Sequence, residues 1–92
     1  MGNVRRRPKR LGEKLLQIRT ALGLSQTEML KRLGAEGIIT YHQISGYESG
    51  KREPPLDILL QYARAAGVCM EALVDDEMNL PAKLPSRVKH KR

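Results

Sequence analysis

Residues 25–49 have the sequence SQTEMLKRLGAEGIITYHQISGYES, which contains two closely spaced start signals for helices. Ser25 is followed three positions later by Glu28, and Thr40 is followed three positions later by Gln43. A Ser or Thr at the N-cap and a Glu or Gln three residues on satisfy each other's backbone N–H groups in a capping box. The stretch therefore predicts two short helices, one after residue 25 and one after residue 40.

Apolar residues and glycines around these signals support the same two helices. A hydrophobic staple pairs the residue before the cap with the residue at the fourth helical position. Both helices have such a pair, Leu24 with Met29 and Ile39 with Ile44. Each is also followed by a glycine, a common C-terminal stop, at Gly34 and Gly50. Two short capped helices in succession are typical of a helix-turn-helix.

The segments on either side predict three more helices. Leu11, Leu15, Ile18 and Leu22 recur at spacings of four, three and four, which places them on one face of a helix that ends at Gly23. Pro55 suits the first position of a fourth helix that ends at Gly67. Its expected apolar face consists of Leu56, Leu59, Leu60, Ala63 and Ala66. A short fifth helix is expected over roughly residues 70–74.

Composition indicates one small all-α domain. The 92 residues include no Trp or Phe and three Tyr, so the core must be mainly aliphatic, which favours helices packed on helices. The single Cys69 excludes an internal disulfide, fits a reducing cytosol, and is expected to be a small buried or capping residue. No apolar stretch is long enough to span a membrane, so we expect a cytoplasmic protein without a membrane partner.

The net charge of +7 lies at the two ends of the chain. Residues 1–10 and residues 83–92 carry five basic side chains each, whereas residues 11–82 carry seven basic and ten acidic ones. Such basic ends bind nucleic acid or anionic lipid, or only keep the protein soluble. For the N-terminal arm we favour phosphate contacts from Arg5, Arg6, Arg7, Lys9 and Arg10.

The chain resembles the XRE family of helix-turn-helix proteins, the phage repressor and Cro type, over about two thirds of its length. The resemblance is carried by Leu22-Gly23-Leu24-Ser25-Gln26, Leu33-Gly34, Ile44-Ser45, Tyr47-Glu48-Ser49-Gly50-Lys51-Arg52, Pro54, Leu59, Ala63 and Gly67-Val68. It implies a compact five-helix, lambda-repressor-like DNA-binding domain whose third helix, about residues 40–49, lies in the major groove. It also implies a transcriptional regulator, a repressor, that binds double-stranded DNA as a homodimer. We expect the domain over residues 11–77, between a basic N-terminal arm (1–10) and a basic C-terminal tail (78–92), both disordered.

The resemblance also implies roles for single residues. Base contacts are expected from Tyr41, His42 and Ser45, near the start of the third helix, although these side chains would also suit a merely solvated face. Contacts to the DNA backbone are expected from Gln26, Thr40, Gln43, Ser49, Lys51 and Arg52. Arg19 and Glu48 match a pair that bridges the first and third helices, the alternative being two unrelated surface charges.

Two departures from the family pattern concern the turn and the third helix. The segment between the two central helices is longer than usual by about four residues, with Ala35-Glu36-Gly37-Ile38 as the apparent insertion. Its tip is expected either to reach the DNA backbone or to pack Ile38 on the domain or on a partner. Gly46 stands where the family has a long polar side chain, so one contact is missing or the backbone approaches the DNA closely.

Other classes of function are less well supported. No acid–base cluster, phosphate-binding glycine loop or activated nucleophile is evident, and His42, His90 and Cys69 lack metal-ligand spacing, so we expect no enzyme, cofactor or metal. The alternative is an antitoxin-like interaction module that binds a protein through residues 75–92 and DNA for autoregulation. Met78, Leu80 and Leu84 are the candidate dimer contacts. RNA binding through the ends is disfavoured, because aromatic pairs for base stacking are nearly absent.

Overall fold

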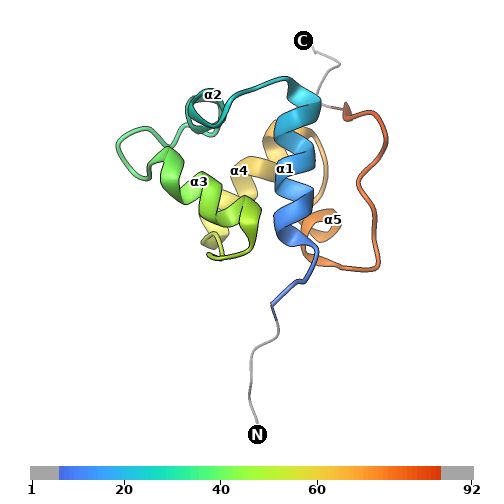
Figure 1. Cartoon of the computed structure of the whole chain (residues 1–92). Coiled ribbons are helices and arrows are strands. Elements are labelled where there is room, and N and C mark those ends of the chain that lie inside the picture. Colours follow the sequence, from blue (N-terminus) through green and yellow to red (C-terminus); the bar gives the residue numbers. More distant parts are fainter. Residues whose placement is uncertain (1–6, 86–92) are drawn as a thin grey trace, which may run out of the picture.

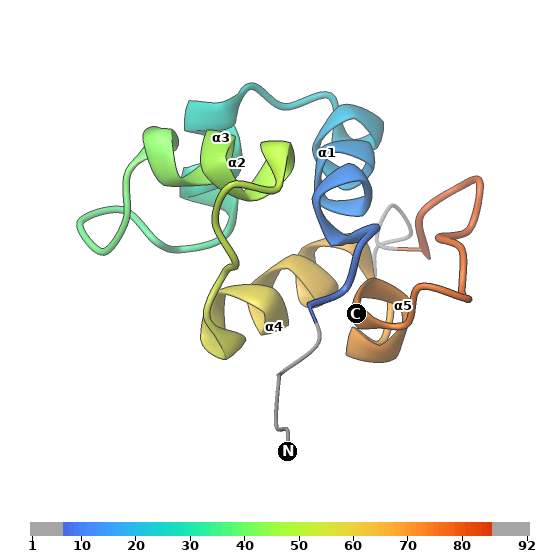
Figure 2. The same ribbon diagram turned by 60° about the horizontal axis from the view of Figure 1, so that its bottom comes forward.

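The computed structural model describes residues 7–85 and contains five helices there, with no β-strand in that range. The helices are α1 (Leu11–Leu22), α2 (Gln26–Arg32), α3 (Tyr41–Ser49), α4 (Leu56–Ala66) and α5 (Met70–Val74). Figures 1 and 2 show α1 between α3 and α5. Helix α4 runs behind α1 and α3 in Figure 1 and below them in Figure 2. The predicted all-α architecture and its five helices are confirmed.

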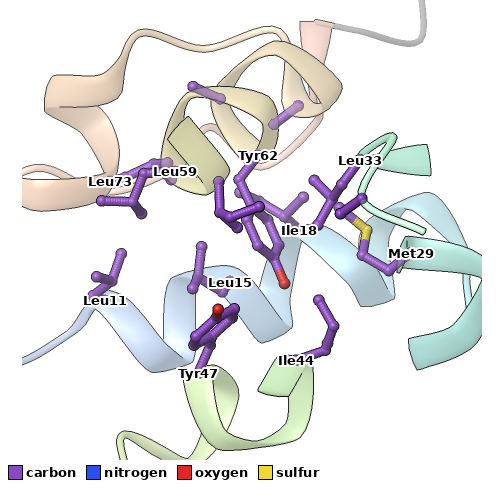
Figure 3. Close-up of a cluster of buried hydrophobic side chains, with 14 of the residues drawn as sticks. Leu11, Leu15, Ile18, Met29, Leu33, Ile44, Tyr47, Leu59, Tyr62 and Leu73 are labelled. Carbon is purple, nitrogen blue, oxygen red and sulfur yellow. The ribbon is translucent and has the colours of Figure 1, made fainter. Parts of the chain in front are cut away.

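The core lies where α1, α3 and α4 meet, and it is aliphatic except for two tyrosines (Figure 3). Leu15, Ile18, Met29, Ile44 and Leu73 are completely buried, each at the centre of its helix's apolar face. Burying such a side chain contributes roughly 1.5–3 kcal/mol. The spacing of four, three and four in the first helix therefore places α1 across the middle of the core.

Local caps set the helix ends near the centre of the chain. The Ser25 hydroxyl accepts the Glu28 N–H at 3.0 Å, and the Glu28 carboxylate accepts the Ser25 N–H at 2.8 Å. These hydrogen bonds lower the pKa of Glu28. At α3 the Gln43 side chain accepts the Thr40 N–H at 3.1 Å. The central helices therefore begin where the capping boxes predict.

The inward face of α4 agrees with the prediction at Leu59, Ala63 and Ala66, whereas Leu60 is half-buried and Leu56 is exposed. Leu56 was expected in the core but is 74% exposed, and Pro55 is the N-cap rather than the first helical residue. The buried residues are Ile58, Leu59, Tyr62, Ala63 and Ala66. At about 100° per residue, Leu56 lies about 200° around the helix from Ile58, so both cannot face the same core.

The packed part of the chain extends beyond residue 77. Leu80 and Leu84 are 7% and 3% exposed and belong to the core cluster, so the expected tail does not begin at residue 78. They are therefore not free to act as dimer contacts, and Met78 is half-buried against the same core. The part of the tail beyond residue 85 lies outside the described residues.

Asp76 and Arg10 attach this C-terminal segment to the start of α1. The Asp76 carboxylate accepts the backbone N–H groups of Lys9 and Arg10, each at 2.9 Å, and these bonds lower the pKa of Asp76. The Arg10 guanidinium donates to the Asp76 carbonyl at 2.8 Å and to the Asn79 side chain at 2.8 Å. No side chain makes an N-cap hydrogen bond to α1, but Asp76, from the other end of the chain, satisfies the backbone N–H of the N-cap residue Arg10.

Lys14 is a completely buried cation on α1. Its Nζ donates to the carbonyl of Ala72 at 2.8 Å and to that of Asp75 at 2.7 Å, at the C-terminal end of α5. A helix C-terminus carries unsatisfied carbonyls and partial negative charge, both of which favour a cation there. Lys14 therefore fixes α5 against α1, a role that the sequence analysis did not assign.

Cys69 is exposed, which contradicts the expectation of a small buried residue. It stands at the N-cap of α5, where its side chain makes no capping bond. A five-residue helix offers little surface to cover the position before it, which explains the exposure.

Replacement of Tyr62 by Phe is expected to stabilise the protein. Tyr62 projects from α4 into the core, and its hydroxyl is buried without a hydrogen-bond partner among the described residues (Figure 3). An unsatisfied buried hydroxyl is unfavourable by about 1 kcal/mol or more, so the free energy of unfolding should rise by about 1 kcal/mol. Thermal and chemical denaturation measure this change, with Tyr41→Phe, at an exposed position, as the control.

The same substitution should change the alkaline limit of stability. Burial raises the pKa of Tyr62 far above the ordinary value of 10, whereas the unfolded chain ionises near 10. Stability is therefore retained below pH 10 and lost as the pH rises above it, because the unfolded state then holds fewer protons. The Phe variant should lose less stability between pH 10 and 11. An equal loss in both proteins would contradict this account.

Candidate nucleic-acid interface

Helix α3 presents one face to the core and one to solvent. Ile44 and Tyr47 are buried, at 0% and 3% exposure, against α1 and α4. The exposed residues of the helix are Tyr41, His42, Ser45 and Ser49. At about 100° per residue, His42, Ser45 and Ser49 lie on the side opposite Ile44 and Tyr47, and Tyr41 lies at the edge of this polar outer face.

Two rings stand together at the start of this face. The ring centroids of Tyr41 and His42 are 4.2 Å apart, and the planes are inclined at 31°. Both side chains are exposed, Tyr41 by 47%. An offset pair of this kind restricts each ring's motion, and it leaves the tyrosine hydroxyl and the imidazole nitrogens available.

A desolvated ion pair holds α3 to α1. Arg19 Nε lies 2.6 Å and an Arg19 terminal nitrogen 3.0 Å from the two oxygens of Glu48, in a bidentate arrangement. The Arg19 and Glu48 side chains are only 19% and 6% exposed, and hydrogen bonding to Glu48 raises the pKa of Arg19. Arg19 also donates to the Leu24 carbonyl at 3.0 Å. The ion pair expected from sequence is therefore present, and it links α1, the loop before α2, and α3.

Gln26 joins this ion pair. Its amide nitrogen donates to Glu48 at 3.2 Å, and the residue is half-buried. Part of the amide that was expected to contact the DNA backbone is therefore held inside the protein by the buried Glu48 carboxylate. The bond to Glu48 uses one of the two N–H groups of the Gln26 amide and leaves the other N–H and the amide oxygen for a further contact.

Gly12 brings α1 unusually close to the end of α3. A Cβ at this position would lie 2.9 Å from the carbonyl oxygens of both Tyr47 and Glu48. Since these are backbone atoms, any side chain would push the two helices apart. This contact was not predicted from the sequence, where its one signal is a glycine near the start of an otherwise regular helix.

The long segment between α2 and α3 is partly anchored. Ala35 and Ile39 are buried, with 1% and 8% of their surface exposed. The Ala35 carbonyl accepts hydrogen bonds from the backbone N–H of Ile38 and from that of Ile39. Gly34 and Gly37 have φ of 69° and 81°, which a side chain would disfavour. Ile38, at the tip, is 69% exposed, so it does not pack on its own domain.

The loop after α3 folds back over Gly46. The Gly46 carbonyl accepts the N–H groups of Lys51 and Arg52, at 3.0 and 3.1 Å, and the Ser49 hydroxyl at 3.2 Å. The aliphatic part of the Arg52 side chain covers the position that a Gly46 side chain would take. Ser49, Lys51 and Arg52 are thus held together at the C-terminal end of α3.

A model of the Helix-turn-helix family matches residues 15–71, from the middle of α1 into α5. The chain belongs to this helix-turn-helix family. It is the XRE type that the sequence indicated, and the family and fold are those of DNA-binding regulators.

A solved structure supports the same fold. The P22 c2 repressor protein, crystallised in complex with a synthetic operator, is similar to this chain with a TM-score of 0.63 and 24% identity. The match covers 73% of this chain and 96% of the repressor chain. The comparison with curated protein sequences found no match.

The other residues predicted to contact the DNA backbone differ in how exposed their side chains are. Thr40, Ser49, Lys51, Arg52, Arg7 and Lys9 are exposed, and Gln43 is half-buried at the start of α3. The Arg10 guanidinium is bonded to the C-terminal segment, so it is not free for a phosphate. Arg5 and Arg6 lie outside the described residues, as does His90.

The described part of the chain contains neither a candidate metal site nor a candidate membrane span. Within residues 7–85 no group of three or more His, Cys, Asp or Glu side chains is placed to hold a metal ion. No helix in that range is long and apolar enough to cross a membrane.

Proposed function

We propose that the protein is a sequence-specific transcriptional repressor that inserts α3 into the major groove of double-stranded DNA. The observation that supports this best is the exposed polar face of α3, which a bidentate ion pair holds rigidly against α1. A helix of this diameter fits the major groove, where base edges differ in their donors and acceptors.

Base recognition is assigned to the first turns of α3. The imidazole of His42 can donate to N7 or O6 of guanine, and the Tyr41 hydroxyl can donate or accept while its ring contacts a thymine methyl group. Ser45 lies one turn after Tyr41, and its hydroxyl can hydrogen-bond to either a donor or an acceptor on a base edge. The contact between the two rings presents them to the DNA as one unit.

Backbone contacts are assigned to residues at the two ends of the helix-turn-helix. They are Gln26, Thr40, Gln43, Ser49 and Lys51, with Arg7 and Lys9 from the arm. Phosphate contacts of this kind set the position of a protein on the duplex without reading its sequence. The unassigned N–H of Gln26 is the group available to a phosphate, since its other N–H is held by Glu48.

The protein is proposed to bind as a homodimer, with half-sites about one helical turn of DNA apart. Selection from a random pool of duplexes with the purified full chain tests both proposals. We expect a two-fold-related motif whose half-sites have centres about 10 base pairs apart. Enrichment of no motif would contradict sequence-specific binding, and enrichment of a single half-site would contradict the dimer.

Removal of the arm charges is expected to weaken the salt dependence of DNA binding. A chain without residues 2–7 lacks Arg5, Arg6 and Arg7 but keeps the bonds of Lys9 and Arg10 to Asp76. Each lost phosphate contact reduces the slope of log affinity against log salt by about 0.9, so the slope should fall by up to about three units. Binding titrations at several salt concentrations measure it, with Arg64→Ala on α4 as a single-charge control. An unchanged slope would exclude the arm from the interface.

A further inference from the structure

The outer face of α3 has a gap in its row of side chains. Gly46 follows His42 by four residues, so the two are neighbours on the surface of the helix. A side chain at position 46 would extend outward next to His42, on the face that the proposed function places in the groove. Glycine supplies no such group.

The Arg52 side chain fills this gap. A Cβ built on Gly46 would lie 2.8 Å from Cδ, 3.1 Å from Cγ and 3.4 Å from Cβ of Arg52. Three successive carbons of one side chain therefore lie over the α carbon of Gly46. The hydrogen bond from the Arg52 N–H to the Gly46 carbonyl, at 3.1 Å, holds the loop in this position.

The charged end of Arg52 is available to a ligand. The residue is exposed, and its guanidinium makes no hydrogen bond or ion pair within residues 7–85. This distinguishes it from Arg10 and Arg19, whose guanidinium groups are bonded inside the protein. Its stem crosses the surface of α3 at Gly46.

We propose that Arg52 reads a base, and so replaces the recognition side chain that position 46 of α3 lacks. This inference rests on the proposed function and reassigns Arg52 from the backbone contacts expected from the sequence. The guanidinium of arginine matches O6 and N7 of guanine with two parallel hydrogen bonds, the commonest specific contact in the major groove. The base is therefore a guanine, adjacent to the one contacted by His42.

Gly46 and Arg52 act as a pair in this arrangement. Any residue with a Cβ at position 46 displaces the Arg52 stem, because 2.8 Å is shorter than a carbon–carbon contact allows. The displaced atoms belong to a flexible side chain, and Gly46 has no positive φ, so alanine fits the helix itself. Gly46→Ala therefore moves the guanidinium without removing its charge.

The test compares the DNA motifs that four full-length proteins select from a random duplex pool: the wild type, Arg52→Ala, Arg52→Lys and Gly46→Ala. The wild type should select a guanine at the Arg52 position in each half-site. Discrimination against the other bases there should fall by about 5- to 150-fold in all three variants, with the other positions unchanged. Arg64→Ala, which removes an exposed charge on α4, should keep the wild-type motif.

Stability measurements separate recognition from folding. The melting temperature of Gly46→Ala should equal or exceed that of the wild type, because alanine favours a helix more than glycine. If all three variants keep the guanine and only Arg52→Ala loses affinity, because lysine retains the charge, Arg52 contacts a phosphate and the inference is wrong while the proposed function stands. If the wild type selects no motif, the proposed function fails and the inference fails with it.

Discussion

Replacement of Arg19 by Ala is expected to lower the free energy of unfolding by about 2–3 kcal/mol and to weaken DNA binding at the same time. Removing one member of a buried ion pair is destabilising by about 3–5 kcal/mol, because the other charge remains buried without its partner. We expect a loss at or below the lower end of that range, because the Arg19 side chain is 19% exposed and solvent screens part of its interaction with Glu48. In the variant, Glu48 would keep only the hydrogen bond from Gln26.

The loss should reach DNA binding because Glu48 lies near the end of α3. Without the ion pair, α3 keeps its apolar contacts with α1 through Ile44 and Tyr47 but loses its polar link to Arg19. The melting temperature should fall by roughly 8–24 °C for a domain of this size. Affinity for the selected duplex, measured well below the melting temperature, should fall as well.

Two further variants separate charge from geometry. Arg19→Lys keeps the charge but cannot make both hydrogen bonds to Glu48, so an intermediate loss of stability is expected. Gln17→Ala, at an exposed position of the same helix, should change little. A loss of affinity with unchanged melting in Arg19→Ala would show that Arg19 contacts DNA and does not hold the helix.

Apart from the Arg19–Glu48 ion pair, which the family resemblance implied, the features that the sequence revealed depend on neighbours within one or two turns. The Ser25 capping box spans four residues, and Gly23 and Gly50 end their helices through bonds to carbonyls only three or four positions back. Such short-range geometry is repeated from protein to protein, so a pattern of residue types is enough to predict it.

The features that were missed depend on backbone atoms far along the chain. Gly12 is required by the carbonyls of Tyr47 and Glu48, and Lys14 is bonded to a carbonyl 58 residues away. A carbonyl group is present at every residue, so the sequence contains no mark of which one a side chain will reach. The position of Arg52 over Gly46 likewise depends on how the loop folds back.

The position of Leu56 shows a further limit. Leu56 and Leu59 are both apolar and three residues apart, which fits a shared face as well as the observed arrangement. Ile58 and Tyr62 decide the choice, because their larger buried surface turns α4 so that Leu56 points away. The periodicity predicted the helix, and only packing selected its face.

The second large effect is expected at Lys14. Its side chain is fully buried, and its Nζ satisfies the carbonyls of Ala72 and Asp75 at the end of α5. Lys14→Ala leaves both carbonyls without this donor and opens a cavity, so the free energy of unfolding should fall by about 3–5 kcal/mol. Lys14→Met keeps most of the volume and should lose about 2 kcal/mol. Chemical denaturation followed by circular dichroism measures both, with Lys31→Ala, at an exposed position of α2, as the control.

The pH dependence of stability distinguishes the buried charge from simple packing. Burial, and next the neighbouring positive charge of Arg10, lower the pKa of Lys14 below its ordinary value of 10.5. Just below pH 10.5 the unfolded chain therefore binds more protons at this residue, so its contribution to stability rises with pH. Tyr62 acts in the opposite sense above pH 10. A Tyr62→Phe background isolates the rise, and Lys14→Met in that background should abolish it. A rise that persists in the double variant would show that another group titrates there.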